Sequence, residues 1–250
     1  MLNEQENVAN REAQPANEQA PAGGFWRSVI EIFSDPFKVF ARIDSGLAWW
    51  KPLMLIIPGS VVLVHLMRPF ETKMKELVMQ GVSGEQLEQV LEKSAKTGYV
   101  SYFTAPAMLV LSYLLISLVL KGMMSFLSSC GRYWKTTALV IFCALIPFVE
   151  TILETAILRA KGVASIESVG DMTINLNLSA IIPTENVALN ALFRSLGVFQ
   201  VWYYVVLILG LAVIFKMSRT RAVIATLPVW FLKYIYFLGQ AFAMGLIGRR

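Results

Sequence analysis

Three ionisable residues lie inside strongly hydrophobic stretches of this chain, where charged side chains are rare. Glu150 and Glu154 are four residues apart in the run at 136–158. Lys233 lies in the run at 222–246. A spacing of four places both carboxylates on one face of a helix. Ionisable groups at low dielectric are usually paired or functional, so these three residues form the candidate polar site of the sequence.

The depth of these residues limits what they can do. At about 1.5 Å per helical residue, Glu150 lies roughly 21 Å and Lys233 roughly 16 Å from the inner ends of their runs. The two can therefore meet if their helices adjoin. A structural ion pair is the simpler interpretation, and a role in transport or proton coupling is the alternative. Glu154 lies nearer the outer surface, where a solvated carboxylate is the simpler interpretation.

Other patterns of catalytic or metal-binding residues are missing from the sequence. His65 is the only histidine, which excludes a histidine-based triad and a multi-histidine metal site. The two cysteines, Cys130 and Cys143, suggest neither a disulfide framework nor a metal site. No glycine-rich phosphate loop or H-E-x-x-H motif occurs. We therefore expect a protein that is not an enzyme and binds no cofactor.

The elements that must position the polar site are membrane helices. Of the 250 residues, 56% are hydrophobic and 16% charged, and the mean hydropathy is +0.59, outside the usual soluble range. A helix needs about 20 mostly apolar residues to cross a bilayer. We predict an all-α integral membrane protein with a disordered polar tail at 1–24. The domain at 25–250 contains five transmembrane helices, at about 51–67, 102–120, 136–158, 198–215 and 222–246.

Positive residues in the connections predict the orientation of these helices. Loops 121–135 and 216–221 each carry three Lys or Arg residues, and four more precede or begin the first run. The longer loops, 68–101 and 159–197, are more dilute in positive charge. With five spans the three basic regions share one side, which predicts a cytoplasmic N-terminus and an outer C-terminus in a bacterial inner membrane. The net charge of +5 is therefore interpreted as helix flanks, and no nucleic-acid partner is expected.

The segment ahead of the first run predicts two short helices. Asp35 is a good N-cap and Pro36 suits a first helical position, so one helix ends near Phe33 and the next begins at Pro36. The pair either lies in the membrane interface or packs against the inner end of the bundle, and the two are compatible. The charged residues on one face are Glu31, Asp35, Lys38 and Arg42. The expected interfacial motif comprises Trp26, Phe33, Asp35, Pro36, Phe37 and Phe40.

Several motifs, in order along the chain, resemble the Yip (Ypt-interacting protein) membrane family. A Trp followed by "DPFKVF" and "WWKP" resembles the start of that family's domain. "MQGVSGEQLEQ", "ALIPFV" and "FQVWYYVVLILGLAVIFKMSRTRA" resemble its prokaryotic branch. The resemblance covers about residues 25–245 and implies a five-helix membrane domain with a cytoplasmic N-terminus. Eukaryotic members act in vesicle traffic, bind prenylated Rab-type GTPases and carry an Asp-Leu-Tyr-Gly-Pro-like element. This chain has Ser34-Asp35-Pro36 without Leu-Tyr-Gly, which argues against a GTPase partner.

Two functions are open from the sequence. The first is a non-enzymatic membrane protein that organises the membrane, in contact with its lipids, or recruits protein partners at the cytoplasmic face. The second is a small transporter or lipid-handling protein that uses Glu150, Glu154 and Lys233, with proline-kinked helices around a midplane site. A polar cavity around Glu150 that reaches either surface would favour the second function. A dry, closed bundle would favour the first.

Overall fold

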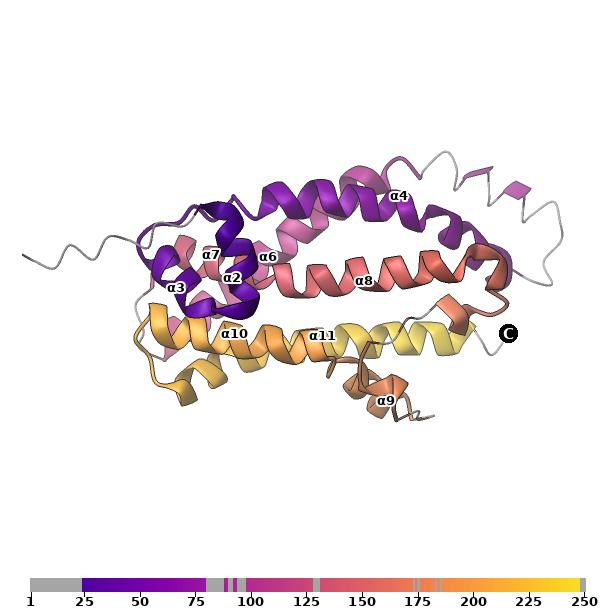
Figure 1. The fold of residues 1–250 in the computed structure, drawn as a ribbon. Coiled ribbons are helices and arrows are strands. Elements are labelled where there is room, and N and C mark those ends of the chain that lie inside the picture. Colours follow the sequence, from indigo (N-terminus) through magenta and orange to yellow (C-terminus); the bar gives the residue numbers. More distant parts are fainter. Residues whose placement is uncertain are drawn as a thin grey trace, which may run out of the picture.

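A computed structural model describes residues 24–79, 88–89, 92–93, 98–127, 131–172, 174, 176–182, 184 and 186–247. In these ranges the structure is α-helical, with short 3₁₀ turns and an isolated bridge between Asn177 and Gly197. Figure 1 shows the long helices side by side in an elongated bundle, with the first helices at one end and the C-terminus at the other. The all-α prediction is confirmed. The tail at 1–23 lies outside the described residues, so its disorder stays a prediction.

The five predicted runs each correspond to helices of the bundle. Four stretches of the described chain are long and apolar enough to cross a membrane, and α10 (Val198–Ile214) is a shorter apolar helix that packs among them. The four are α4 (Leu53–Val78), α6 (Ser101–Phe126), the rod of α7 (Tyr133–Cys143) and α8 (Leu145–Lys161), and α11 (Arg219–Ile247). This arrangement confirms a membrane protein with about five spans.

The first span is longer than the sequence predicts. Helix α4 continues past the expected end at 67 as far as Val78. The extension is held by a second, smaller hydrophobic cluster in which Phe70 is buried with Leu158 and Ile166. Part of the outer connection therefore continues the helix because its apolar face finds a partner on the end of α8.

The third span is interrupted between α7 and α8. Pro147 has no amide hydrogen, so the carbonyl of Cys143 loses the helical bond it would otherwise accept, and the proline ring crowds that carbonyl. Ala144, at the junction, keeps a near-helical backbone with φ −64° and ψ −15°. The interruption is therefore mild, and Pro147, which causes it, lies about one turn before Glu150.

The two short N-terminal helices form where the sequence places them. Helix α2 (Phe25–Ser34) ends just before Asp35, and α3 (Pro36–Asp44) begins with the proline at its first position. Asp35 occupies the N-cap position without a capping hydrogen bond from its side chain. Its carboxylate instead pairs with Lys38 at 2.7 Å, and that hydrogen bond holds the pKa of Asp35 below its usual value.

Helices α2 and α3 pack against the end of the bundle formed by α7, α8 and α10. Arg42 reaches Glu31 at 2.5 Å and Ser28 at 2.8 Å, and all three residues are buried. The hydrogen bond from Arg42 holds the pKa of Glu31 below its usual value. Two members of the charged face thus turn inward and join the helices, which is the packed arrangement left open by the sequence.

The aromatic residues of the N-terminal motif divide between the core and the surface. Phe40 is completely buried, which corrects its placement at the interface. A Cβ on Gly210 of α10 would come within 2.9 Å of the Phe40 ring, so this glycine lets α3 approach closely. Phe33 is half-buried. Trp26 and Phe37 are 66% and 52% exposed, so they remain candidates for contact with lipid.

Candidate functional site

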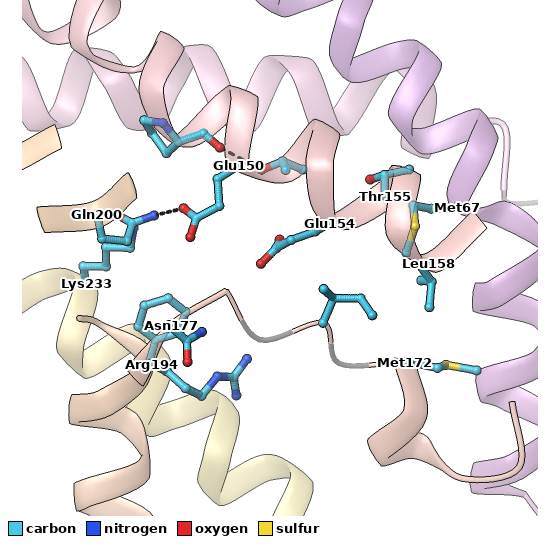
Figure 2. Close-up of a pocket in the computed structure, with 14 residues that line it drawn as sticks. Met67, Glu150, Glu154, Thr155, Leu158, Met172, Asn177, Arg194, Gln200 and Lys233 are labelled. Atoms are coloured by element: carbon cyan, nitrogen blue, oxygen red, sulfur yellow. Dashed lines mark hydrogen bonds between the residues drawn. The ribbon is translucent and has the colours of Figure 1, made fainter. Parts of the chain in front are cut away.

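A polar cavity of about 450 Å³ surrounds Glu150. Figure 2 shows Glu150 and Glu154 projecting into it from α8. Arg194, the last residue of α9 (Val187–Arg194), and Lys233 of α11 face it from the other side. Gln200, in the first turn of α10, completes the polar lining. The structure therefore brings all three ionisable residues singled out in the sequence to one cavity.

Glu150 and Lys233 are joined through Gln200 rather than by a direct ion pair. The side-chain Nε2 of Gln200 donates to Glu150 Oε2 at 2.5 Å, and its Oε1 accepts a hydrogen bond from Lys233 Nζ. A carboxamide carries a donor and an acceptor, so one side chain satisfies both charges. Glu150 and Gln200 are buried. The expected meeting of the two charges is thus corrected to a three-residue bridge.

A close backbone approach places Glu150 at the start of α10. A Cβ on Gly197, the residue before this helix, would lie 3.2 Å from Glu150 Oε1 and 3.3 Å from the Cβ of Asn177. Asn177 forms the isolated bridge with Gly197, which holds the outer loop against this point. The N-terminus of a helix carries a partial positive charge that favours a carboxylate. Glycine here therefore allows α10 to stabilise the charge of Glu150.

Glu154 and Arg194 face the cavity, and neither forms an ion pair with a described residue. In the ranges that the structure describes, no ion pair or hydrogen bond reaches either side chain. The Arg194 guanidinium lies 5.4 Å from the ring centroid of Phe237, and Lys233 Nζ lies 5.6 Å from the same centroid. Phe237 thus holds two cations on one wall of the cavity, while both carboxylates come from α8 on the other (Figure 2).

A larger, mainly apolar cavity of about 770 Å³ adjoins the polar one. Gln200 and Lys233 line both cavities, so the bridge lies at their boundary. The apolar cavity is also lined by Met108 of α6 and by Leu232 and Tyr236 of α11. These three side chains are 64%, 52% and 61% exposed, so the cavity opens to the outside of the bundle.

Comparison with known proteins identifies the family. The family model described as the Yip1 domain matches residues 30–240. The chain belongs to the Yip1-domain family. The matched range includes every residue that lines the two cavities. The chain is also similar to membrane protein YknW of Bacillus subtilis (strain 168), with 27% identity over 195 residues, or 74% of this chain and 77% of the relative. No solved structure matches it significantly.

The polar site of this Yip1-domain protein includes two residues that the sequence reasoning did not select. Gln200 is the one carboxamide in the apolar run at 198–215, and that isolation is a usable signal. Arg194 belongs to a loop helix, and nothing in its local pattern indicates that it lines the cavity. Only the packing of α9 on α11 brings it to the cavity.

Proposed function

We propose that this Yip1-domain protein is a non-enzymatic, lipid-handling membrane protein that binds an amphiphile inside its bundle. The observation that carries the proposal is the adjacency of a charged cavity and an apolar cavity that share Gln200 and Lys233. A lipid headgroup requires polar partners and an acyl chain requires apolar surface. One amphiphile therefore satisfies both cavities, whereas a small water-soluble substrate would leave the apolar one unused.

The position of the apolar cavity also suits a lipid. Its exposed lining residues, Met108, Leu232 and Tyr236, face the surroundings of the bundle, so a chain can enter sideways from the bilayer. The headgroup would then follow to the boundary at Gln200 and Lys233. The polar cavity around Glu150 supports lipid handling over a purely organising role.

Native mass spectrometry of the protein in mild detergent tests this function. We expect one phospholipid to remain bound per chain. Ser112 lines the apolar cavity and is exposed on α6, so Ser112→Phe should fill the cavity while the helix still forms. A loss of about 1.4 kcal/mol in binding free energy would weaken lipid binding about tenfold. Ser125→Phe, at an exposed position of α6 outside both linings, is the matched control.

An organising or recruiting role is a second proposal with its own support. Trp26, Ile30 and Phe37 form an exposed apolar face on α2 and α3, with exposed fractions of 66%, 68% and 52%. This face lies at the end of the bundle where the basic loops gather, so it suits contact with an anionic lipid surface or a protein partner there. The expected orientation places this end in the cytoplasm of a bacterium, beneath the inner membrane.

Reporter fusions test the orientation on which the second proposal depends. A cytoplasm-active reporter fused after Arg219 should be active, because the loop at 216–221 is dense in positive charge. The same reporter fused within 165–180 should be inactive. The reverse pattern would place α2 and α3 outside and remove the recruiting proposal.

A further inference from the structure

We propose that the polar cavity selects a zwitterionic headgroup with a primary ammonium and a phosphate, as in ethanolamine phospholipids. The ammonium would bind Glu154 and Glu150, and the phosphate would bind Arg194 and Lys233. This inference rests on the proposed lipid-binding function and specifies the headgroup.

The charges of the cavity favour a ligand that is neutral overall. Its ionisable lining residues are Glu150, Glu154, Arg194 and Lys233, so two negative groups face two positive ones. A bound anion or a bound cation would leave one uncompensated charge in the cavity, which is unfavourable away from bulk water. A zwitterion places its positive group near the two carboxylates and its negative group near the two cations. The net charge of the cavity is then unchanged.

The arrangement of these charges favours a ligand that is extended between them. The carboxylates project from α8, whereas the cations stand on α9 and α11 beside Phe237 (Figure 2). Glu154 and Arg194 have opposite charges and form no ion pair with each other. The cavity between the two walls has about 450 Å³, within the range of about 300–1,000 Å³ typical of small-molecule sites. A dipolar headgroup lying across the cavity would form an ion pair with Glu154 at one end and with Arg194 at the other.

The lining also distinguishes a primary ammonium from a quaternary one. A primary ammonium donates hydrogen bonds to carboxylates, whereas quaternary ammonium groups are recognised by cages of aromatic rings. Among the residues that line this cavity, Phe237 is the one aromatic side chain, and it already contacts Arg194 and Lys233. The carboxylate wall therefore offers hydrogen-bond acceptors and no aromatic cage, which favours ethanolamine over choline.

The same headgroup chemistry exists in soluble molecules, and the apolar cavity decides between the two sources. A soluble glycerophosphoethanolamine would use the polar cavity alone. A phospholipid also places a chain among Met108, Ile116 and Leu232 on the other side of the Gln200–Lys233 boundary. We therefore assign the site to a membrane lipid.

Competition between lipids, measured by native mass spectrometry on the full-length protein, tests the headgroup. The protein is supplied with equal amounts of phosphatidylethanolamine, phosphatidylcholine and phosphatidylglycerol. We expect at least about tenfold preference for phosphatidylethanolamine, the effect of about 1.4 kcal/mol. Glu154→Gln should remove the preference and shift binding toward anionic phosphatidylglycerol, because the cavity then carries a net positive charge. Arg194→Gln should weaken the binding of all three lipids.

A matched control and a soluble competitor complete the experiment. Arg159→Gln removes an exposed charge from α8, one turn beyond Glu154 and outside the lining, and should leave the lipid preference unchanged. Equal binding of all three lipids, with loss of binding in Ser112→Phe, would overturn the headgroup inference and leave the lipid-binding function standing. Absence of any retained lipid would overturn both. Displacement of the lipid by equimolar glycerophosphoethanolamine would overturn the assignment to a membrane lipid, and with it the lipid-binding function, while the headgroup preference would stand.

Discussion

The two ends of the bundle use buried charge in different ways. At the end formed by α2 and α3, Glu31 and Arg42 contact each other directly at 2.5 Å, and Ser28 accepts a further hydrogen bond from the same arginine. In the polar cavity, Gln200 separates Glu150 from Lys233. Charges paired directly inside a small contact have no capacity left for a ligand. Charges held apart around a cavity have that capacity, so the first group joins helices and the second can bind.

The largest expected loss of stability comes from breaking the pair of Glu31 and Arg42. Glu31→Gln leaves Arg42 buried beside a neutral partner, which should lower the free energy of unfolding by about 3 kcal/mol. Thermal unfolding in detergent measures the loss. Combining Glu31→Gln with Arg42→Met should recover much of it, because the two effects are coupled. The control is Lys38→Ala, which removes an exposed ion pair and should cost at most about 0.5 kcal/mol.

The same pair predicts a dependence of stability on pH. Folding lowers the pKa of Glu31 from its usual 4.5, so its contribution is fully present above pH 4.5 and is lost as the pH falls through the folded-state value. Acid should therefore destabilise the wild type relative to Glu31→Gln, and the difference between them should vanish at low pH. A difference between the two proteins that is the same in acid as at neutral pH would show that the pairing does not carry the effect.

Mutations that break the Gln200 bridge in the cavity should cause a smaller loss of stability. Gln200→Leu removes the hydrogen bonds to both Glu150 and Lys233, and should cost about 2 kcal/mol of unfolding free energy. Lys233→Met removes one of the two bonds and should cost less. If Lys233→Met were the more damaging change, direct attraction between the two charges would outweigh the bridge.

The unpaired charges should contribute almost nothing to stability. Glu154→Gln breaks no ion pair within the described structure, so it should change the free energy of unfolding by less than about 0.5 kcal/mol. Arg194→Gln also loses the contact with the Phe237 ring and should cost at most about 1 kcal/mol. Their effect should fall on lipid selectivity. A large destabilisation by either change would mean that these side chains hold the fold, and the contrast between the two ends would disappear.

The smallest effect on stability is expected at the exposed face of α2 and α3. Phe37→Asp should leave thermal unfolding unchanged and reduce the protection of these helices from hydrogen exchange in lipid vesicles. Phe40→Asp should instead unfold the inner end, because Phe40 is buried against Gly210. Equal exchange of Phe37→Asp and wild type in vesicles would show that the face does not touch lipid.

Features set by local sequence could be predicted, whereas those set by packing could not. Length and hydropathy located the helices, and the Asp35-Pro36 pair located the break between α2 and α3. The spacing of the charged residues predicted that Glu31 and Arg42 lie on one charged face. It could not show that these two side chains are buried and meet, because that depends on how α2 and α3 pack together, with Ser28 of α2 accepting a hydrogen bond from Arg42.

Most charged residues of the polar site could be predicted from the sequence, whereas the hydrogen bonds between them could not. Glu150 and Lys233 stand out as charges in apolar helices, so the sequence identifies them. The bridge requires α8, α10 and α11 to meet at one depth, which no spacing along the chain encodes. The close approach at Gly197 and the position of Arg194 depend likewise on how the outer loop folds back onto the bundle.

The most direct test of the central claim, a phospholipid seated in the cavity, is a solid-state NMR measurement of distance between lipid phosphorus and arginine side-chain nitrogen. The protein is labelled with ¹⁵N-arginine and placed in phosphatidylethanolamine bilayers. A charge-assisted N–H···O bond of about 2.7–2.9 Å puts the phosphorus within about 4 Å of the Arg194 guanidinium. We predict a strong phosphorus–nitrogen coupling that is lost in Arg194→Gln and kept in Arg159→Gln. Interfacial arginines can couple to lipid phosphorus in every variant, so a spectrum that Arg194→Gln leaves unchanged, or a wild type without any coupling, would contradict the account.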